Sequence, residues 1–449
     1  MRLPTLFVLA SVLANTACGG GGDPVQATVS IATSTTTSSA TTTVAPATIT
    51  TVAPATITTT MTTKVTSTAT VPPTTTTATT TNATPTTVTP PPTTARSPRF
   101  YDFSAVGPII QDYVDDQGLN GAGLIVVERY DGVVHHQHWG EFGPDRISLI
   151  ASSSKMLVAG ILMHLHDRGL LDVDAPVADV VPWDVDPAIT PVQLVSNTSG
   201  LVGLLPNVAY GPYICQFLPV GTLQDCARQI LTTPDDDADV IPPDTNFRYG
   251  GGQWQVAGAV AELASGRSWA ELVDEVYVKP CGLDGLAFNN PFTQFDTPPF
   301  THPPAFAGNP ETLVATDNPN LEGGAYSTTG SYGALLLMYL RGGVCAGGRV
   351  LSVDAVDRLV ADRTLAVLDG DDADGVLAYG IGTGYGMGWW IDRATGRRSD
   401  GGAYGSMPWL NLSDGYGAYL VVEATSAHGR ELAERLYDVI DEAVNAARR

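Results

Sequence analysis

The chain has 449 residues and a formal net charge of −23, and its composition changes sharply near residue 98. Residues 24–95 contain one charged residue, Lys64, and are dominated by Thr, Pro, Ala and Val, so the charge falls almost entirely on the part that follows. Such an acidic domain is repelled by nucleic acid and by anionic membrane surfaces, which argues against either as a partner.

The N-terminal segment predicts export. Residues 1–17 carry Arg2 and then an apolar run from Leu3 to Leu13, which has the length of a signal-peptide core and is too short to span a bilayer as a mature helix. Cys18 follows Asn-Thr-Ala and precedes four glycines, which resembles a bacterial lipobox with Asn15 in place of the usual Leu. We therefore expect 18–23 to be a lipidated cysteine with a glycine spacer, and the protein to be lipid-anchored on the outer side of the cell membrane. Simple secretion is the alternative.

The next segment, residues 24–98, is interpreted as a disordered Thr/Pro-rich linker. It has too little apolar surface to offset the entropy of ordering, so it stays extended and solvated. Residues 99–449 are long enough for two packed subdomains that share a cleft.

Within residues 99–449 the elements follow in a clear order. Segments 123–129 and 133–139 flank an Asp-Gly turn and predict a β-hairpin. Helices are predicted over 153–168, 254–265 and 331–341, and helical spacing of apolar residues predicts one over 429–449. Runs joined by Gly- and Asp-containing turns predict strands over 387–392, around 409–412 and over 416–423. The expected fold class is α+β, with an antiparallel sheet formed by the N- and C-terminal strands, flanking helices, a helical subdomain and the active site in the cleft between them.

Four cysteines follow Cys18, an even number in an exported chain, and they predict two disulfides among Cys215, Cys226, Cys281 and Cys345. Cys215 with Cys226 is the first pairing to consider, although the other connectivities and free buried thiols remain open. His135, His136 and His138 lie on one predicted strand. They have no carboxylate at ligand spacing, so we interpret them as strand histidines and expect no metal and no organic cofactor.

Ser152 and Lys155 form the candidate catalytic pair. Ser152 stands where an apolar helix begins, and Lys155 lies one turn further on the same face. Burial and the helix N-terminus both disfavour an ammonium, so the lysine is expected to become a base that can activate the serine. The chain has three lysines against twenty arginines, which makes a lysine here distinctive. The alternative is that Ser153 and Ser154 cap the helix and Lys155 is solvated.

The surrounding order of segments resembles the serine β-lactamase and penicillin-binding protein family across nearly all of 105–445. Ile150-Ala-Ser-Ser-Ser-Lys155 matches its first motif, and Arg168–Val177 matches the segment after that helix. Ile189–Leu201 is similar to the family's Leu-Leu-x-His-Thr-Ser-Gly-Leu stretch. The resemblance implies that Ser152 is the nucleophile and Lys155 its activating partner.

The family's second motif is Tyr-x-Asn, in which the Tyr relays protons and the Asn holds the acyl amide. The resemblance assigns Tyr249 to the first role, whereas Gly251 stands where the Asn would be. Esterase-like members are known to share this loss, which suggests relaxed recognition of amides. A half-buried structural role for Tyr249 is the alternative.

The third motif normally places a cation and a backbone N–H on an inner strand, and its counterpart here is Asp400-Gly401-Gly402-Ala403. The resemblance implies that the N–H groups of Ser152 and Ala403 form the oxyanion hole. Gly251, Asp400, Gly401 and Gly402 are then the expected substrate-binding residues. Asp400 would repel a substrate carboxylate, unless its side chain points away from the cleft or the motif is shifted by one residue.

These observations predict an exported serine hydrolase that acts through a covalent acyl-enzyme on a small-molecule or peptide ester or amide. Esterase or D-amino-acid peptidase substrates are expected over efficient β-lactam hydrolysis. A catalytically weak or silent penicillin-binding-like protein of the cell surface is the alternative, and the sequence gives no indication of the oligomeric state.

Overall fold

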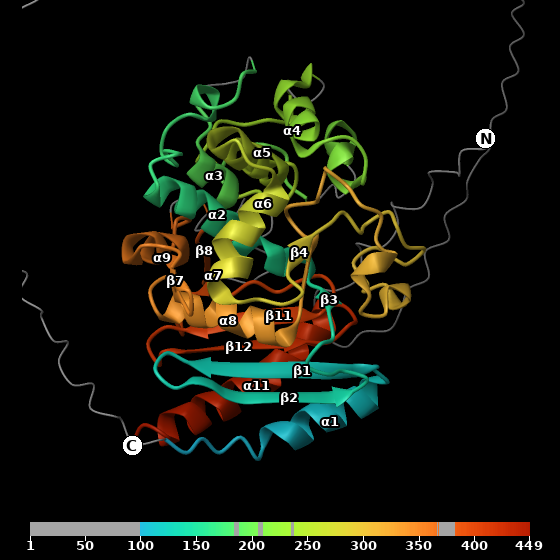
Figure 1. Ribbon diagram of the computed structural model, residues 1–449, viewed down its shortest axis with the longest axis vertical. Helices are drawn as coiled ribbons and strands as arrows, with labels where there is room; N and C mark the ends of the chain where they lie inside the picture. The colour runs from blue at the N-terminus through green and yellow to red at the C-terminus, as the bar shows by residue number, and fades with distance from the viewer. Residues whose placement is uncertain (1–98, 184–187, 205–209, 235–237, 366, 368–381) are drawn as a thin grey trace, which may run out of the picture. The chain divides into compact units, whose positions relative to one another are not determined.

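The computed structural model describes residues 99–449 except 184–187, 205–209, 235–237, 366 and 368–381 (Figure 1). The expected signal peptide, the Cys18 spacer and the linker over 24–98 lie outside the described residues. The helices are α1 (Val106–Gln117), α2 (Lys155–Asp167), α3 (Pro191–Val195), α4 (Leu223–Thr232), α5 (Gln253–Ser265), α6 (Trp269–Val273), α7 (Lys279–Cys281), α8 (Thr329–Leu340), α9 (Val353–Val360) and α11 (Ser426–Ala446). The strands are β1 (Gly121–Glu128), β2 (Gly132–Gly140), β3 (Ser148–Leu149), β4 (Ala287–Phe288), β5 (Ala325–Ser327), β6 (Val344–Cys345), β7 (Gly348–Arg349), β8 (Thr383–Tyr385), β9 (Trp390–Asp392), β10 (Arg398–Ser399), β11 (Ser406–Asn411) and β12 (Tyr416–Val421).

The main sheet joins the two ends of the domain. Its strand order is β2-β1-β12-β11-β10-β9-β8, and the strands pair antiparallel, with Ile125 of β1 opposite Tyr419 of β12. The sequence prediction of one antiparallel sheet built from N- and C-terminal strands is confirmed. Shorter sheets, β3-β5-β4 and β6-β7, lie outside it.

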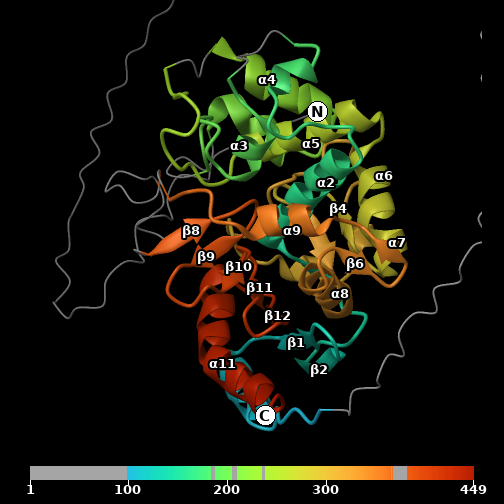
Figure 2. The same ribbon diagram turned by 90° about the vertical axis from the view of Figure 1, so that its left-hand side faces the viewer.

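Both faces of this sheet are covered by helices (Figures 1 and 2). Strand β1 is buried at every position, and its successive side chains alternate between two cores. Leu124 and Val126 pack with residues of α1 and α11 on one face. Ile125 and Val127 pack on the other face, in the core that contains α8 and α2. Strand β1 therefore lies between the two hydrophobic cores and contributes side chains to both.

Helix α2 carries the candidate catalytic lysine into the middle of the larger core. Its side chains are buried from Lys155 to Leu165, and it contacts α3, α5 and α9. A helix that is apolar all round is stable only when it is surrounded by other elements. At Gly160 an added Cβ would lie 2.1 Å from the hydroxyl of Tyr277, which donates to the carbonyl of Leu157 at 2.8 Å. This close contact sets the position of α2 precisely.

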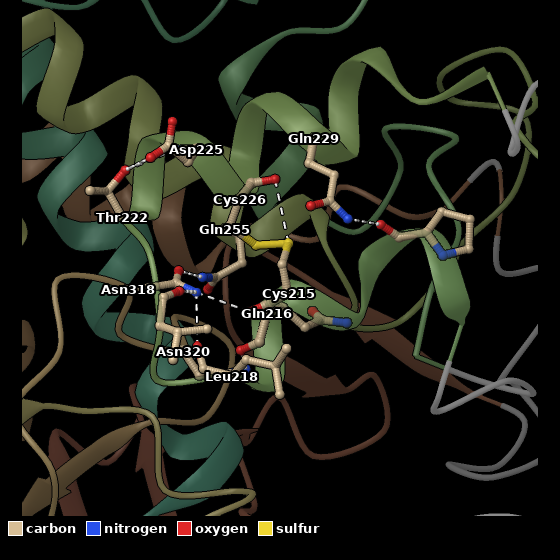
Figure 3. Close-up of a disulfide and its surroundings, with 12 residues drawn as sticks. Cys215, Gln216, Leu218, Thr222, Asp225, Cys226, Gln229, Gln255, Asn318 and Asn320 are labelled. Carbon is tan, nitrogen blue, oxygen red and sulfur yellow. Dashed lines mark hydrogen bonds between the residues drawn. A yellow bond between two sulfur atoms is a disulfide. The ribbon is translucent and has the colours of Figure 1, made fainter. Parts of the chain in front are cut away.

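Two disulfides brace the helical part of the domain. Cys215–Cys226 connects the 3₁₀ segment Gly211–Phe217 to α4, and Cys281–Cys345 connects α7 to β6. Figure 3 shows the first of them beside Asn318, whose side-chain amide donates to the carbonyl of Cys215 at 2.9 Å. Of the described helices, none has the length and apolar character needed to cross a bilayer.

Candidate active site

Ser152 and Lys155 lie together at the start of α2. Residues Ala151–Ser154 form a 3₁₀ turn that runs directly into the helix. Ser152 is partly exposed, Lys155 is fully buried, and the Lys155 Nζ lies 3.0 Å from the Ser152 Oγ. The alternative of a solvated lysine does not describe this structure. Ala151, with φ at 44°, holds a strained conformation immediately before the serine.

The surroundings of Lys155 favour a neutral amine. Burial lowers the pKa of its ammonium, and the carboxylates of Glu322 and Asp400 oppose that shift. The Nζ also donates to the carbonyl of Glu322 at 2.8 Å and lies 4.7 Å from the ring centroid of Tyr249. A neutral amine within hydrogen-bond distance of a serine hydroxyl can accept its proton.

The neighbouring serines connect this turn to other segments instead of capping α2. The hydroxyl of Ser154 donates to the carbonyl of Ala151 at 2.6 Å and accepts the N–H of Ala325 at 3.0 Å. The hydroxyl of Ser153 donates to the carbonyl of Asp400 at 2.6 Å. These bonds join the start of α2 to strand β5 and to the predicted third motif.

Tyr249 lies beside Lys155 in an aromatic cluster. Its side chain is 4% exposed, and its ring centroid is 5.1 Å from that of Trp390. The turn that follows Tyr249 is held by Asn197, whose Oδ1 accepts the N–H of Gly250 at 3.1 Å and the indole N–H of Trp254 at 3.0 Å. Asn197 lies in the stretch that resembles Leu-Leu-x-His-Thr-Ser-Gly-Leu, and its role here is to hold this turn.

Sequence reasoning missed Glu322, which adds a second carboxyl, besides that of Asp400, near Lys155. Its side chain is 4% exposed, and its Oε2 accepts the N–H of Gly251 at 2.7 Å and lies 3.9 Å from the Lys155 Nζ. Burial raises the pKa of this carboxyl, while Lys155 and the Gly251 N–H oppose the rise. The one sequence signal that could have pointed to it is the missing Asn at 251, which leaves the position next to Lys155 to another residue.

The predicted third motif is bonded to the turn that carries Ser152. The hydroxyl of Ser406 donates to the carbonyl of Ile150 at 2.7 Å. At Gly402 an added Cβ would lie 2.1 Å from that carbonyl, so the close approach of the two segments requires a glycine. Ala403 and Ser152 are both partly exposed, and the N–H of Ala403 makes no hydrogen bond with a described residue. The role of that N–H in an oxyanion hole stays a prediction.

Asp400 is not exposed to solvent, because its side chain has 0% exposure. Burial raises the pKa of its carboxyl well above the ordinary value, while Lys155 and the N–H of Met156 at the start of α2 oppose the rise. This position corresponds to the alternative in which the carboxyl does not line an open cleft. The substrate-binding roles of Gly251, Asp400, Gly401 and Gly402 remain predictions.

The strand histidines are explained by packing. His136 and His138 both contact the hydroxyl of Thr329, at 2.9 and 3.0 Å between Nε2 and Oγ1, where α8 begins. In the part of the chain that the structure describes, no group of three or more His, Cys, Asp or Glu side chains could hold a metal ion.

The antiparallel sheet, the buried central helix and a Ser-Lys pair with a neighbouring tyrosine are the arrangement expected of a β-lactamase-type serine hydrolase. The chain matches the Beta-lactamase family over residues 107–442 and belongs to that family.

Among its relatives, penicillin-binding protein 4 of Amycolatopsis lactamdurans is 26% identical over 317 residues, which cover 67% of this chain and 77% of the relative. Esterase EstB of Burkholderia gladioli is 28% identical over 185 residues, 37% of this chain and 44% of the esterase. The crystal structure of a β-lactamase-like protein from Bacteroides dorei superposes with a TM-score of 0.60 at 26% identity, covering 76% of this chain and 99% of that one. Because these relatives carry the names of different activities, the family alone leaves the substrate open.

Proposed function

We propose that the protein is an exported serine hydrolase that cleaves an ester or amide through an acyl-enzyme on Ser152. The observation that carries the proposal is the buried Lys155 amine 3.0 Å from the Ser152 Oγ, because burial lowers the pKa of its ammonium and so favours the form that can accept the serine proton. The partly exposed serine hydroxyl is accessible to an acyl group, whereas the amine is not accessible to solvent.

The proposed reaction uses two steps. The Ser152 Oγ attacks the carbonyl carbon and its proton passes to the Lys155 Nζ. The bond to the leaving group then breaks, and the leaving group takes that proton with Tyr249 as the relay. The N–H groups of Ser152 and Ala403 hold the oxyanion, each contributing roughly 3 kcal/mol in the transition state. Water attacks the acyl-enzyme in the second step, which releases the acid and restores the serine.

The proposed substrate class is an ester or amide without a carboxylate next to the scissile bond. Position 400 is an aspartate, so it supplies no cation for such a group, and position 251 has no side-chain amide to hold an acyl amide. The name of one relative, esterase EstB, is compatible with this class. Penicillins and peptides ending in a free D-Ala carboxylate are expected to be poor substrates.

We also propose that the protein is exported and held at the outer side of the cell membrane by a lipid anchor. Residues 1–17 would direct export, Cys18 would carry the lipid, and 24–98 would give the domain reach from the membrane. Globomycin treatment of producing cells tests the anchor, because it blocks cleavage before a lipidated cysteine. An unprocessed precursor is the expected result, and normal release into the medium would indicate simple secretion instead.

A labelling experiment with a substrate panel tests the activity. The purified domain is treated with a fluorophosphonate probe and assayed with chromogenic esters, D-amino-acid amides and β-lactams. We expect labelling at Ser152, loss of the label and of turnover in Ser152→Ala, and faster turnover of esters or amides than of penicillins. Efficient penicillin hydrolysis would refute the substrate preference, and absence of both label and turnover would favour a silent binding protein.

A further inference from the structure

The carboxylate of Glu322, a residue far along the chain, binds the turn that follows Tyr249. In the family pattern this turn carries an asparagine at the position of Gly251. Gly251 donates its N–H to the Oε2 of Glu322 at 2.7 Å, and the same oxygen lies 3.9 Å from the Lys155 Nζ. The other carboxyl oxygen, Oε1, is buried and has no hydrogen-bond partner among the described residues. A buried carboxylate is costly, so this one calls for an explanation.

The two glycines of the turn leave room for this carboxylate. An added Cβ at Gly250 would lie 2.6 Å from the Glu322 Oε2, and one at Gly251 would lie 2.7 Å from the carbonyl oxygen of Val202. Both glycines also have positive φ, 69° and 83°. A side chain at either position would therefore collide with the carboxylate or with backbone. A Cβ at 250 would meet the Glu322 carboxylate, and a Cβ at 251 would meet the backbone of Val202 and Gly203, so this turn does not accommodate an asparagine at 251.

The segment that carries Glu322 is held rigidly from behind. Gln255 of α5 accepts the N–H of Leu321 at 2.7 Å and donates to the side chain of Asn318 at 3.0 Å. The amide of Asn320 donates to the carbonyl of Gln216 at 2.8 Å and accepts the N–H of Gly323 at 2.8 Å. Figure 3 shows Gln255, Asn318 and Asn320 gathered around the Cys215–Cys226 disulfide. The carboxylate is thus fixed in place by bonds on both sides of it in the chain.

The Lys155 amine has hydrogen-bond contacts with some groups, whereas the Glu322 carboxylate acts on it only through its charge. The Lys155 Nζ makes two short contacts, to the Ser152 Oγ at 3.0 Å and to the Glu322 carbonyl at 2.8 Å. A neutral amine has two N–H groups and one lone pair, so one N–H can donate to the Glu322 carbonyl while the lone pair faces the serine hydroxyl and accepts its proton. At 3.9 Å the carboxylate is beyond hydrogen-bond distance of that amine, yet its charge acts strongly in a buried site.

We propose that Glu322 is a positioning residue that replaces the missing asparagine: its carboxylate holds the Tyr249 turn through Gly251 and stabilises the protonated form of Lys155 against the neutral one. Its charge sets how readily the lysine gives up its proton, and its hydrogen bond keeps the tyrosine beside the amine. This inference rests on the proposed acyl transfer at Ser152.

Glu322→Gln tests the charge, because it keeps an oxygen for the Gly251 N–H and the carbonyl that accepts from Lys155. The measurement is the second-order rate of fluorophosphonate labelling of Ser152 across pH. The wild-type rate should fall on the acid side as Lys155 becomes protonated. Without the charge of Glu322, and with the carboxyl of Asp400 unchanged, the ammonium loses its proton more easily, so the acid limb should move to lower pH by about one unit or more. The matched control is Glu262→Gln, which removes another carboxylate that accepts a backbone N–H, that of Trp269 at 2.8 Å, and should not move the limb.

Glu322→Ala is the second variant, and it tests the charge even if the glutamine variant fails to fold. It should shift the acid limb in the same way and also lower the plateau rate about tenfold, because the Gly251 N–H loses its acceptor. An acid limb that stays in place in both variants, or moves to higher pH, overturns the inference while labelling of the wild type upholds the proposed function. A wild-type protein that is not labelled at any pH overturns both.

Discussion

The two sides of the candidate site are built in different ways. The first side, Ile150–Lys155, is one continuous segment in which helix geometry alone brings Lys155 next to Ser152. The second side combines Asn197, the turn from Tyr249 to Gly251, and Glu322, which are far apart in the chain and joined by hydrogen bonds. The first side follows the family pattern and the second departs from it. Residues on one helix keep their relative positions because the helix fixes them. In a group built from several segments, one side chain can be replaced by another from a different segment.

Lys155→Met gives the largest expected effect and tests the first side. Methionine retains the buried aliphatic volume but cannot accept a proton, and it removes the amine that lies beside the carboxyls of Glu322 and Asp400. We expect the rate of fluorophosphonate labelling at Ser152 to fall about ten-thousand-fold. Thermal unfolding of the variant shows whether the domain remains folded. Labelling within a factor of ten of the wild type would mean that another group is the base, and the two sides could no longer be distinguished by role.

The two disulfides offer a matched comparison behind the second side. They close loops with sequence separations of 11 and 64, so removing Cys215–Cys226 should cost about 3 kcal/mol of unfolding free energy and removing Cys281–Cys345 about 4 kcal/mol. Only the shorter loop carries the carbonyl that holds Asn318 near Glu322. The variant in which Cys281 and Cys345 are both serine should therefore lose more stability. The variant in which Cys215 and Cys226 are both serine should lose more activity. Denaturant titration and ester turnover measure both, and equal activities would remove the link between that disulfide and the site.

Tyr249→Phe separates a proton relay from a packing role. The ring can keep its contacts with Trp390 and with the Lys155 Nζ, so the stability should change little. Loss of the phenol should reduce kcat for an ester about a hundredfold if it relays the proton to the leaving group. Unchanged turnover would leave Tyr249 as a structural residue of the second side.

The sequence was sufficient to predict elements that depend on neighbouring residues or on the order of the family's motifs. The Asp-Gly turn between 123–129 and 133–139 and the turn-bounded run 416–423 predicted strands that pair in the sheet, and the apolar run after Ser152 predicted α2. Glu322 was not predictable, because no periodicity or spacing relates it to Lys155, and the contact depends on how α5 orients Leu321. The burial of Asp400 was open for the same reason: a residue at the end of a short strand can face either way, and packing against α2 decides it.

The smallest expected effect concerns His302, which lies behind the third motif of the site. Its ring centroid is 5.7 Å from that of Tyr404, the residue after Ala403, and its Nε2 is 4.0 Å from Glu423. Burial lowers the pKa of His302 to about 4, with Arg146 in the same direction and Glu423 opposing. The imidazole is therefore neutral when the protein is folded, whereas in the unfolded chain it binds a proton below its ordinary value near 6.5.

Because the folded pKa is the lower one, the stabilisation is present above pH 6.5 and is lost as the pH falls toward 4. This single group should remove about 2 kcal/mol of unfolding free energy between pH 7 and pH 5. His302→Gln should lose correspondingly less over that interval in urea titrations, and His428→Gln, a partly exposed histidine of α11, should follow the wild type. Parallel curves for the wild type and His302→Gln would mean that His302 also titrates normally in the folded protein. The segment behind Ala403 would then be open to water, and the oxyanion side of the site would be less rigid than the start of α2.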